Sequence, residues 1–257
     1  MSWIRSSKGI TLLAVLVVAF AAVGVVTAAS VTAVDAPAEA QVGEEITVSA
    51  TISDVYETSD QWTLNGTTEL QNVTGWEVTK VTPSGAENTT RFSGSKTFSV
   101  GISAEENLDH VNVSITGTVP PVETFSYDPP QSFVAAKFVR VQGNNVNDIE
   151  TITVHHYTNE SQTARNVIDE AWKVVNGSNS QSAWETLNTS IDVFEGENFQ
   201  EAKDLARNAK QTARNAKQSA QTTQLILYGV GALVVIALVG GGIYYWRSQQ
   251  NDYDKLR

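Results

Sequence analysis

The side chains best suited to acid–base or metal chemistry are the three histidines, His110, His155 and His156. Adjacent residues of a strand point to opposite faces, so His155 and His156 do not fit a single metal site. No phosphate-binding loop, nucleophile elbow or ordered Ser/His/Asp set accompanies them. The sequence therefore predicts no catalytic residue, no metal site and no cofactor.

An oxygen-rich segment supplies a weaker candidate for chemistry, with Asn144, Asn145, Asn147, Asp148 and Glu150 in close succession. Carboxylate and amide oxygens bind Ca²⁺, but their spacing here is not that of an EF-hand loop. We interpret the segment as the polar turn of a surface hairpin. The tryptophans fit core positions better than a ligand-stacking platform, so we expect no enzyme and no small-molecule substrate.

Composition limits the classes of partner. The chain carries a net charge of −11, which opposes binding to nucleic acid. It contains no cysteine, so its folded parts are stabilised without disulfides.

Two apolar segments predict the location of the protein. Residues 1–29 resemble a signal peptide, with Arg5 and Lys8 ahead of an apolar run and a small-residue cleavage site, although an uncleaved anchor remains the alternative. Residues 225–246 would span about 33 Å as a helix, which matches a hydrocarbon core of about 30 Å. We therefore predict a single-pass cell-membrane protein with residues 30–224 outside and a cytoplasmic tail at 247–257.

Asparagines in glycosylation sequons all lie between these apolar segments. We expect some but not all of them to be occupied, and Asn112 is the most doubtful because it falls in a predicted strand. The candidates are Asn65, Asn72, Asn88, Asn112, Asn159, Asn176 and Asn188.

Period-two alternation predicts strands in the first half of the chain. Ile46, Val48, Ala50 and Ile52 alternate with short hydroxyl side chains, and similar patterns recur near residues 62–64, 76–78, 97–100 and 111–115. Turn residues, Asn65-Gly66 among them, separate these runs. The spacing predicts an immunoglobulin-like β-sandwich over 30–119, followed at 120–157 by a proline-containing connector and a β-hairpin of open placement.

Helical periodicity begins near residue 158. Residues 158–197 predict a helical hairpin, with capping patterns that begin at Asn159, Ser182 and Asn198. Residues 198–224 predict a longer stalk helix with alanines at 4,3 spacing, a coiled-coil pattern. The predicted association seam is Ala202, Ala206, Ala209, Ala213, Ala216 and Ala220.

The seam leaves three interpretations open, because the stalk is longer than the two preceding helices. The stalk self-associates, or another protein's helix covers it, or it is a lone solvated helix. Its partners would then be the membrane, envelope proteins or a second copy of the chain.

The order of parts resembles that of archaeal, particularly haloarchaeal, cell-surface glycoproteins with immunoglobulin-like or S-layer-type β-domains. The resemblance lies in Gln41 to Asp54, Thr163 to Glu170 with Glu195 to Ala209, and Gly240 to Arg247. It is one of layout, and it implies an envelope or adhesion setting without assigning any functional residue.

Three functions are compatible with this sequence. The first is a non-enzymatic surface glycoprotein in envelope structure or protein–protein adhesion. The second is an accessory or sensory subunit of a membrane complex, for transport, envelope assembly or cell shape, that pairs through the stalk and span. The third is a viral envelope spike.

Overall fold

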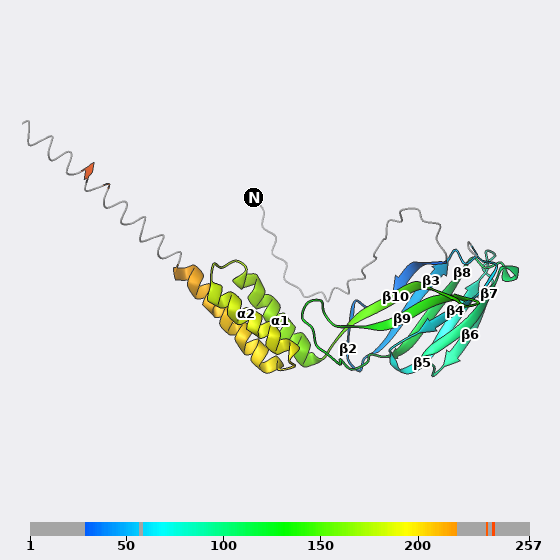
Figure 1. Cartoon of the computed structure of the whole chain (residues 1–257), viewed down its shortest axis with the longest axis horizontal. Coiled ribbons are helices and arrows are strands. Elements are labelled where there is room, and N and C mark those ends of the chain that lie inside the picture. Colours follow the sequence, from blue (N-terminus) through cyan, green and yellow to red (C-terminus); the bar gives the residue numbers. More distant parts are fainter. Residues whose placement is uncertain (1–28, 57–58, 220–234, 236–237, 240–257) are drawn as a thin grey trace, which may run out of the picture. The chain divides into compact units, whose positions relative to one another are not determined.

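The computed structural model describes residues 29–56, 59–219, 235 and 238–239. Contacts along the chain divide it into two compact units, one up to Gln162 and one from Thr163 onward. The first unit is built from strands and the second from helices (Figure 1).

Within the described residues, ten strands form two five-stranded sheets, in the orders β1-β3-β8-β5-β6 and β2-β10-β9-β4-β7. All pairings are antiparallel except that of β10 with β2. The strands are β1 (Ser30–Asp35), β2 (Glu39–Gln41), β3 (Glu45–Ser53), β4 (Gln61–Thr67), β5 (Gln71–Val81), β6 (Glu87–Ser93), β7 (Thr97–Ser103), β8 (His110–Thr118), β9 (Ser132–Gln142) and β10 (Asn145–Tyr157), with a short 3₁₀ helix η1 (Ala104–Glu106) before β8.

The two sheets pack face to face around one apolar core. Trp76 of the first sheet contacts Phe98 and Phe138 of the second, with ring centroids 4.9 and 6.2 Å apart. The inward residues of β3 and β8 are buried while their neighbours reach the surface, which confirms the alternation seen in these two segments.

Proline and glycine mark the points where the chain changes sheets. β1 pairs in the first sheet and β2 in the second, and Pro37 between them cannot donate a backbone hydrogen bond to a ladder. On the opposite side Gly94, with a φ of 67°, lies in the turn that takes the chain from β6 to β7.

The Asn65-Gly66 turn was a wrong prediction. Both residues lie inside β4, where Gly66 pairs with Phe98 on one side and Phe138 on the other. A Cβ at position 66 would collide with the ring of Phe98. The glycine therefore serves close packing of an aromatic ring rather than a reversal of the chain.

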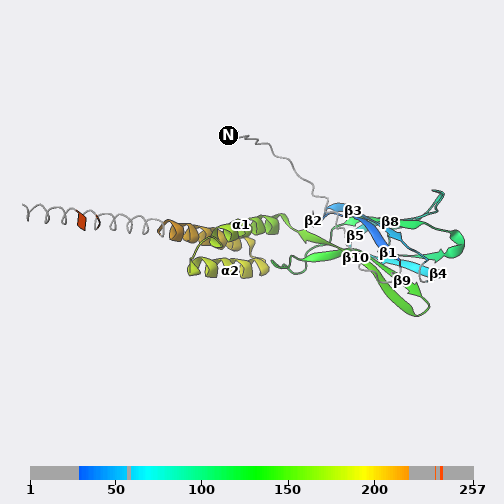
Figure 2. The ribbon, with the colours of Figure 1, turned by 90° about the horizontal axis from the view of Figure 1, so that it is seen from above.

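The helical unit contains α1 (Asn159–Val175), α2 (Gln181–Glu195) and a third helix at residues 199–219, which we call the alanine helix. Figures 1 and 2 both show the three lying side by side. Trp172 of α1 meets Trp184 of α2 edge-on at 6.4 Å, and Phe194 of α2 meets Phe199 at 5.4 Å.

The helix caps differ in position from the predicted ones. Thr158 and Ser161 exchange backbone-to-side-chain hydrogen bonds of 2.9 and 3.1 Å at the start of α1. Ser180 rather than Ser182 caps α2. Only the predicted pair Asn198 and Glu201 is confirmed, with the Glu201 amide donating to Asn198 Oδ1 at 3.4 Å.

The predicted fold class included a coiled-coil stalk, and this part of it is wrong. Ala202, Ala206, Ala209 and Ala213 are fully buried within the chain's own helical unit, so no coiled-coil stalk forms over the described residues. Ser190 of α2 donates to the carbonyl of Ala202 at 2.9 Å, and Lys210 pairs with Glu170 of α1 at 2.7 Å. Alanine lets helices approach closely, and here the neighbours are α1 and α2.

The fold class also needs correction in its membrane span. In the β part, β9 and β10 pair as a hairpin that extends the second sheet beyond residue 119, one of the placements that the sequence left open. Among the described residues no helix is long and apolar enough to cross a membrane. That finding overturns the predicted transmembrane helix and single-pass localisation. All but the last residue of the predicted leader at 1–29, most of 225–246 and the tail at 247–257 lie outside the described residues.

Candidate functional site

The outer surface of the first sheet carries a regular array of short polar side chains. In β3, β5 and β8 these polar residues alternate with buried apolar residues of the same strand. In β6 they lie directly opposite the polar residues of β5. We call this surface the threonine face, and define it by Thr47, Ser49 and Thr51 of β3, Asn112, Ser114 and Thr116 of β8, Glu77 and Thr79 of β5, and Thr89 and Arg91 of β6.

Cross-strand hydrogen bonds hold these side chains in place. The hydroxyls of Thr47 and Thr116 are 2.8 Å apart, and those of Thr79 and Thr89 are 2.9 Å apart. Arg91 Nε donates to Glu77 Oε2 at 2.8 Å, so the two charges on the face neutralise each other. Short β-branched side chains with directly opposed partners have little rotamer freedom, so the face is a preorganised surface.

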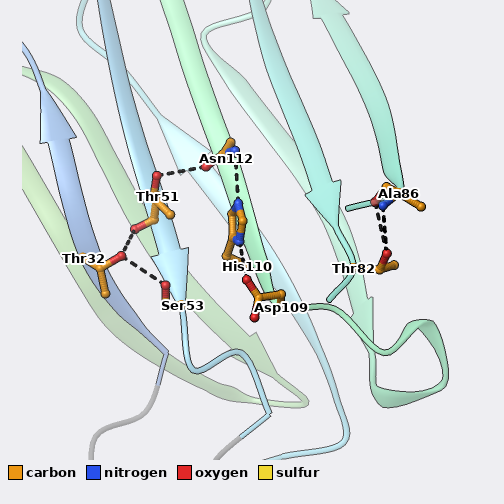
Figure 3. A network of polar contacts seen from close by, with 8 residues as sticks. All are labelled: Thr32, Thr51, Ser53, Thr82, Ala86, Asp109, His110 and Asn112. Carbon is orange, nitrogen blue, oxygen red and sulfur yellow. Dashed lines mark hydrogen bonds and ion pairs between the residues drawn. The ribbon is translucent and has the colours of Figure 1, made fainter. Parts of the chain in front are cut away.

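A chain of polar contacts runs across one end of the threonine face (Figure 3). Asp109 Oδ2 lies 2.7 Å from Nδ1 of His110, and Asn112 Nδ2 lies 3.3 Å from its Nε2. Thr51 donates to Oδ1 of the same asparagine at 2.9 Å. These contacts assign Nδ1 of His110 as the donor to Asp109 and Nε2 as the acceptor.

The first strand joins this network through an irregularity. A bulge between Val31 and Ala33 shifts the register of β1 against β3 at Thr32. The Thr32 hydroxyl lies 3.4 Å from the carbonyl of Thr51 and 3.1 Å from the hydroxyl of Ser53 (Figure 3). At the other side of the sheet, Thr82 bonds both backbone groups of Ala86 and closes the β5–β6 hairpin.

An Asp–His pair forms two thirds of a catalytic triad, whose third member is a nucleophile such as a serine hydroxyl. Here the group beside the histidine is an amide instead. A catalytic histidine uses its second ring nitrogen to take a proton from a nucleophile. In this structure that nitrogen of His110 faces the amide of Asn112. The pair therefore orients an amide on an open sheet surface. Sequence reasoning missed this arrangement, because only the pairing of β3 with β8 brings Thr51 to Asn112.

Of the other two histidines, His156 borders a separate cleft of about 530 Å³ in the β unit, lined mainly by polar residues. His156 is 6% exposed, packs on Phe133 at 5.2 Å, and donates from Nδ1 to the carbonyl of Pro120 at 3.2 Å. His155 instead lies beside Tyr157, at 6.0 Å, and contacts the carbonyl of Gln131 through Nδ1 at 2.7 Å. The two rings thus make separate contacts.

Burial gives His156 a pH-dependent role in stability. Desolvation is the largest cause that lowers its pKa and the nearby His155 adds to it, whereas the hydrogen bond to Pro120 and the charge of Glu69 oppose it. Because the folded-state pKa lies below the unfolded value, the unfolded state binds more protons as the pH falls. The contribution of His156 to stability is complete above the unfolded pKa of about 6.5 and declines below it.

We expect the free energy of unfolding of the β unit to fall more steeply between pH 7.5 and pH 5.5 in the natural chain than in a His156→Phe variant. The variant keeps an aromatic ring against Phe133 and lacks the titrating group. Denaturant unfolding, followed by tryptophan fluorescence at both pH values, measures the two slopes. Equal slopes would contradict a buried, uncharged His156.

The oxygen-rich segment forms the tip of the β9–β10 hairpin. Asp148 makes a cross-strand ion pair with Lys137 at 3.0 Å, and Glu150 accepts from the amide of Thr151 at 3.0 Å. Across the described residues no group of three or more His, Asp or Glu side chains is placed to hold a metal ion.

The sequons differ in how accessible they are. Asn72, Asn88, Asn159, Asn176 and Asn188 are exposed. Asn65 is half-buried in β4, and its Oδ1 is buried without a hydrogen-bond partner. Asn112 is exposed, but its amide is engaged by Thr51 and His110. Glycan attachment at each stays a prediction, and Asn65 is the least accessible of them.

The six alanines of the predicted association seam differ in burial. Ala202, Ala206, Ala209 and Ala213 are buried in the helical unit, Ala216 is half-buried, and Ala220 lies outside the described residues. The structure therefore brings the first four together with α1 and α2.

Comparisons with known proteins add no family. No protein-family model and no curated protein matches the chain. Several solved structures show marginal likeness, two of them as follows. One is the alkylpurine DNA glycosylase AlkC from Pseudomonas fluorescens bound to abasic-site DNA, at 16% identity over 51% of this chain and 29% of that one, with a TM-score of 0.21. The other is a glycosyl hydrolase family 2 member from Bacteroides cellulosilyticus, at 13% identity over 49% and 14%, with a TM-score of 0.17.

The present chain thus spans less than a third of the length of either solved protein. At these TM-scores neither likeness carries an argument about activity.

Proposed function

We propose that this protein is a non-enzymatic surface glycoprotein of the cell envelope that binds another envelope protein through the threonine face. The observation that supports this most directly is the hydrogen-bonded array of hydroxyl and amide side chains on one side of the first sheet. A flat, ordered surface with adaptable donors and acceptors suits contact with a protein better than capture of a small molecule, which requires a concave site.

The dimensions of the face set the kind of interaction. Four strands spaced at about 4.8 Å, each contributing about five residues at about 3.3 Å, give a platform of about 14 by 17 Å. A standard interface buries about 800 Å² of each partner, more than twice this planar area. The threonine face therefore forms the centre of a contact that also involves its rim, or it makes a weak and transient contact.

Charge is arranged to permit such binding despite the acidic chain. Of the ten residues that define the face, only Glu77 and Arg91 are charged, and they pair with each other. Asp35, opposite Ser49 in register, and Glu45 place exposed carboxylates at the margin, so the ten residues form an area of zero net charge on a protein with a net charge of −11. Like-charge repulsion between acidic envelope proteins is smallest over such a surface.

The accessible sequons fit a glycoprotein that keeps this face clear. Asn88 alternates with Thr89 along β6, so its side chain points away from the face. The exposed Asn176 and Asn188 belong to the helical unit rather than to this sheet. We expect Asn112 to stay unmodified, because attachment there would place a glycan in the middle of the face.

The accessory-subunit alternative loses much of its original support. It relied on alanines free to meet a partner helix, and four of these are buried against the chain's own helices. A loss of binding after substitution of Ala206 would therefore report unfolding of the helical unit rather than a lost interface.

The proposal is tested by site-specific photo-crosslinking in the producing cells. A photoreactive residue replaces Ser114, at the centre of the face, and in a matched chain Thr151, an exposed residue of β10. We expect a discrete envelope-protein adduct from position 114 that excess unlabelled natural protein competes away, and none from position 151. Equal labelling from both positions, or no competable adduct from position 114, would contradict the proposal.

A further inference from the structure

Strand β7 is an edge of the second sheet, and its middle residues are unprotected. It pairs with β4 over its full length without a register shift, and no other described strand pairs with it. Its outward side chains are Thr97, Ser99, Gly101 and Ser103, with no charge and no proline. Proteins usually block an edge strand with charges, bulges, proline or short length.

The other edge strands show such protection. β1 contains a bulge, β2 has only three residues, and β6 carries Glu87 and Arg91. The contrast singles out β7 as the edge at which another strand can add.

In β7, every second residue bonds to β4, and the backbone groups of the residues between them face outward. The amide of Thr68 donates to the carbonyl of Lys96 at 3.1 Å, and that of Ala104 to the carbonyl of Asp60 at 2.7 Å. Bonded pairs alternate in an antiparallel ladder, so residues 98, 100 and 102 bond to β4. The backbone groups of residues 97, 99, 101 and 103 therefore point away from the sheet.

The chain itself satisfies the two ends of this row. Ser95 Oγ donates to the carbonyl of Thr97 at 2.6 Å and accepts from its amide at 3.2 Å. At the other end Tyr56 donates to the carbonyl of Ser103 at 2.8 Å, and Glu106 accepts from its amide at 3.3 Å. In the described structure this leaves the N–H and C=O groups of Ser99 and Gly101 open.

We propose that β7 pairs antiparallel with β7 of a second copy of this chain, about a two-fold axis at Val100. Ser99 then lies opposite Gly101 of the second copy, and Gly101 opposite its Ser99. Both are bonded pairs, so the four open groups of each copy are all satisfied. A two-fold contact of this kind is self-complementary and closes at a dimer.

Side chains and charge fit this register. A Cβ at Gly101 would meet nothing within 4 Å, so the outer face of the sheet is open beside this edge. Beyond the strand, the same two-fold axis brings Lys96 towards η1 of the second copy, which contains Glu105. Both Lys96 and Glu105 are exposed, so the symmetric contact gains two attractions of opposite charge. An unrelated acidic strand would not provide this match.

Disulfide trapping tests the register directly, because the natural chain has no cysteine. Two differently tagged full-length chains, one with Ser99→Cys and one with Gly101→Cys, are mixed and oxidised with oxidised glutathione. Bonded pairs lie about 5.5 Å apart between Cα atoms, within disulfide range. We expect mixed 99–101 disulfides to exceed each like-with-like product at least tenfold. Comparable yields of all products, or none, would overturn the proposal.

Sedimentation of the full chain gives a second readout. We expect its mass to rise from 27.8 kDa toward twice that value with concentration. Lys96→Glu or Glu105→Lys should each weaken dimerisation about tenfold, and the double exchange should restore it to within about threefold. A monomer at all concentrations, or a dimer that none of these changes affects, would also overturn it. Neither test depends on a partner of the threonine face, so the two proposals can fail separately.

Discussion

An Ala206→Glu substitution is expected to unfold the helical unit while the β unit stays folded. Ala206 is fully buried, and its neighbours on the seam, Ala202 and Ala209, are buried with it. A carboxylate at this buried position loses its hydration, a cost of about 4 kcal/mol or more. A unit of about 60 residues has a total stability of about 3–9 kcal/mol, so this loss removes most or all of it.

Hydrogen exchange read by mass spectrometry on the full chain measures this outcome. Peptides from residues 159–219 should lose their protection, while peptides from β3 and β8 keep theirs. The matched control is Asn208→Glu, which adds the same charge at an exposed position of the same helix. Retained protection in the Ala206→Glu chain would show that the alanine helix does not depend on α1 and α2.

A Gly66→Ala substitution is expected to destabilise the β unit by about 1–3 kcal/mol, the usual cost of overpacking a core. The added methyl collides with the ring of Phe98. That ring cannot move aside easily, because Trp76 lies 4.9 Å away and Phe92 5.7 Å away. The backbone of Gly66 is also paired on both sides of β4, which prevents a shift of the strand.

Gly101→Ala provides the control for this experiment, since position 101 lies on the strand that neighbours β4 and has open space around it. There the loss of backbone entropy in the unfolded state should leave stability unchanged or raise it by up to about 1 kcal/mol. Denaturant unfolding of both variants compares them. A Gly66→Ala chain as stable as Gly101→Ala would contradict the packing described around Phe98.

Prediction from sequence succeeded for strands that bury one face and expose the other, because neighbouring residues in the sequence show this alternation. The strand β3 was predictable because Ile46, Val48, Ala50 and Ile52 alternate with polar residues, and the structure buries all four. Asn65-Gly66 was misjudged because a glycine used for close packing looks the same in sequence as a glycine used for a turn. The ring that requires it comes from Phe98, a distant residue.

The prediction of a coiled-coil stalk along the alanine seam was wrong for a similar reason. Its 4,3 spacing identifies a face that contacts other helices, and it does not say which helices these are. The structure shows the chain's own α1 and α2 there, for example through Lys210 and Glu170. The candidate site was equally hidden, because the contact of Asn112 with Thr51 depends on the register of strands about 60 residues apart.

The central claim, that the threonine face binds a protein partner, is tested most directly by measuring the affinity of the crosslinked partner for surface variants. Ser114→Arg places a bulky charge at the centre of the face, and Thr151→Arg places the same charge on β10. We predict that Ser114→Arg raises the Kd at least tenfold, which corresponds to about 1.4 kcal/mol, and that Thr151→Arg leaves it unchanged. Equal affinities for the natural chain and the Ser114→Arg chain would contradict the account.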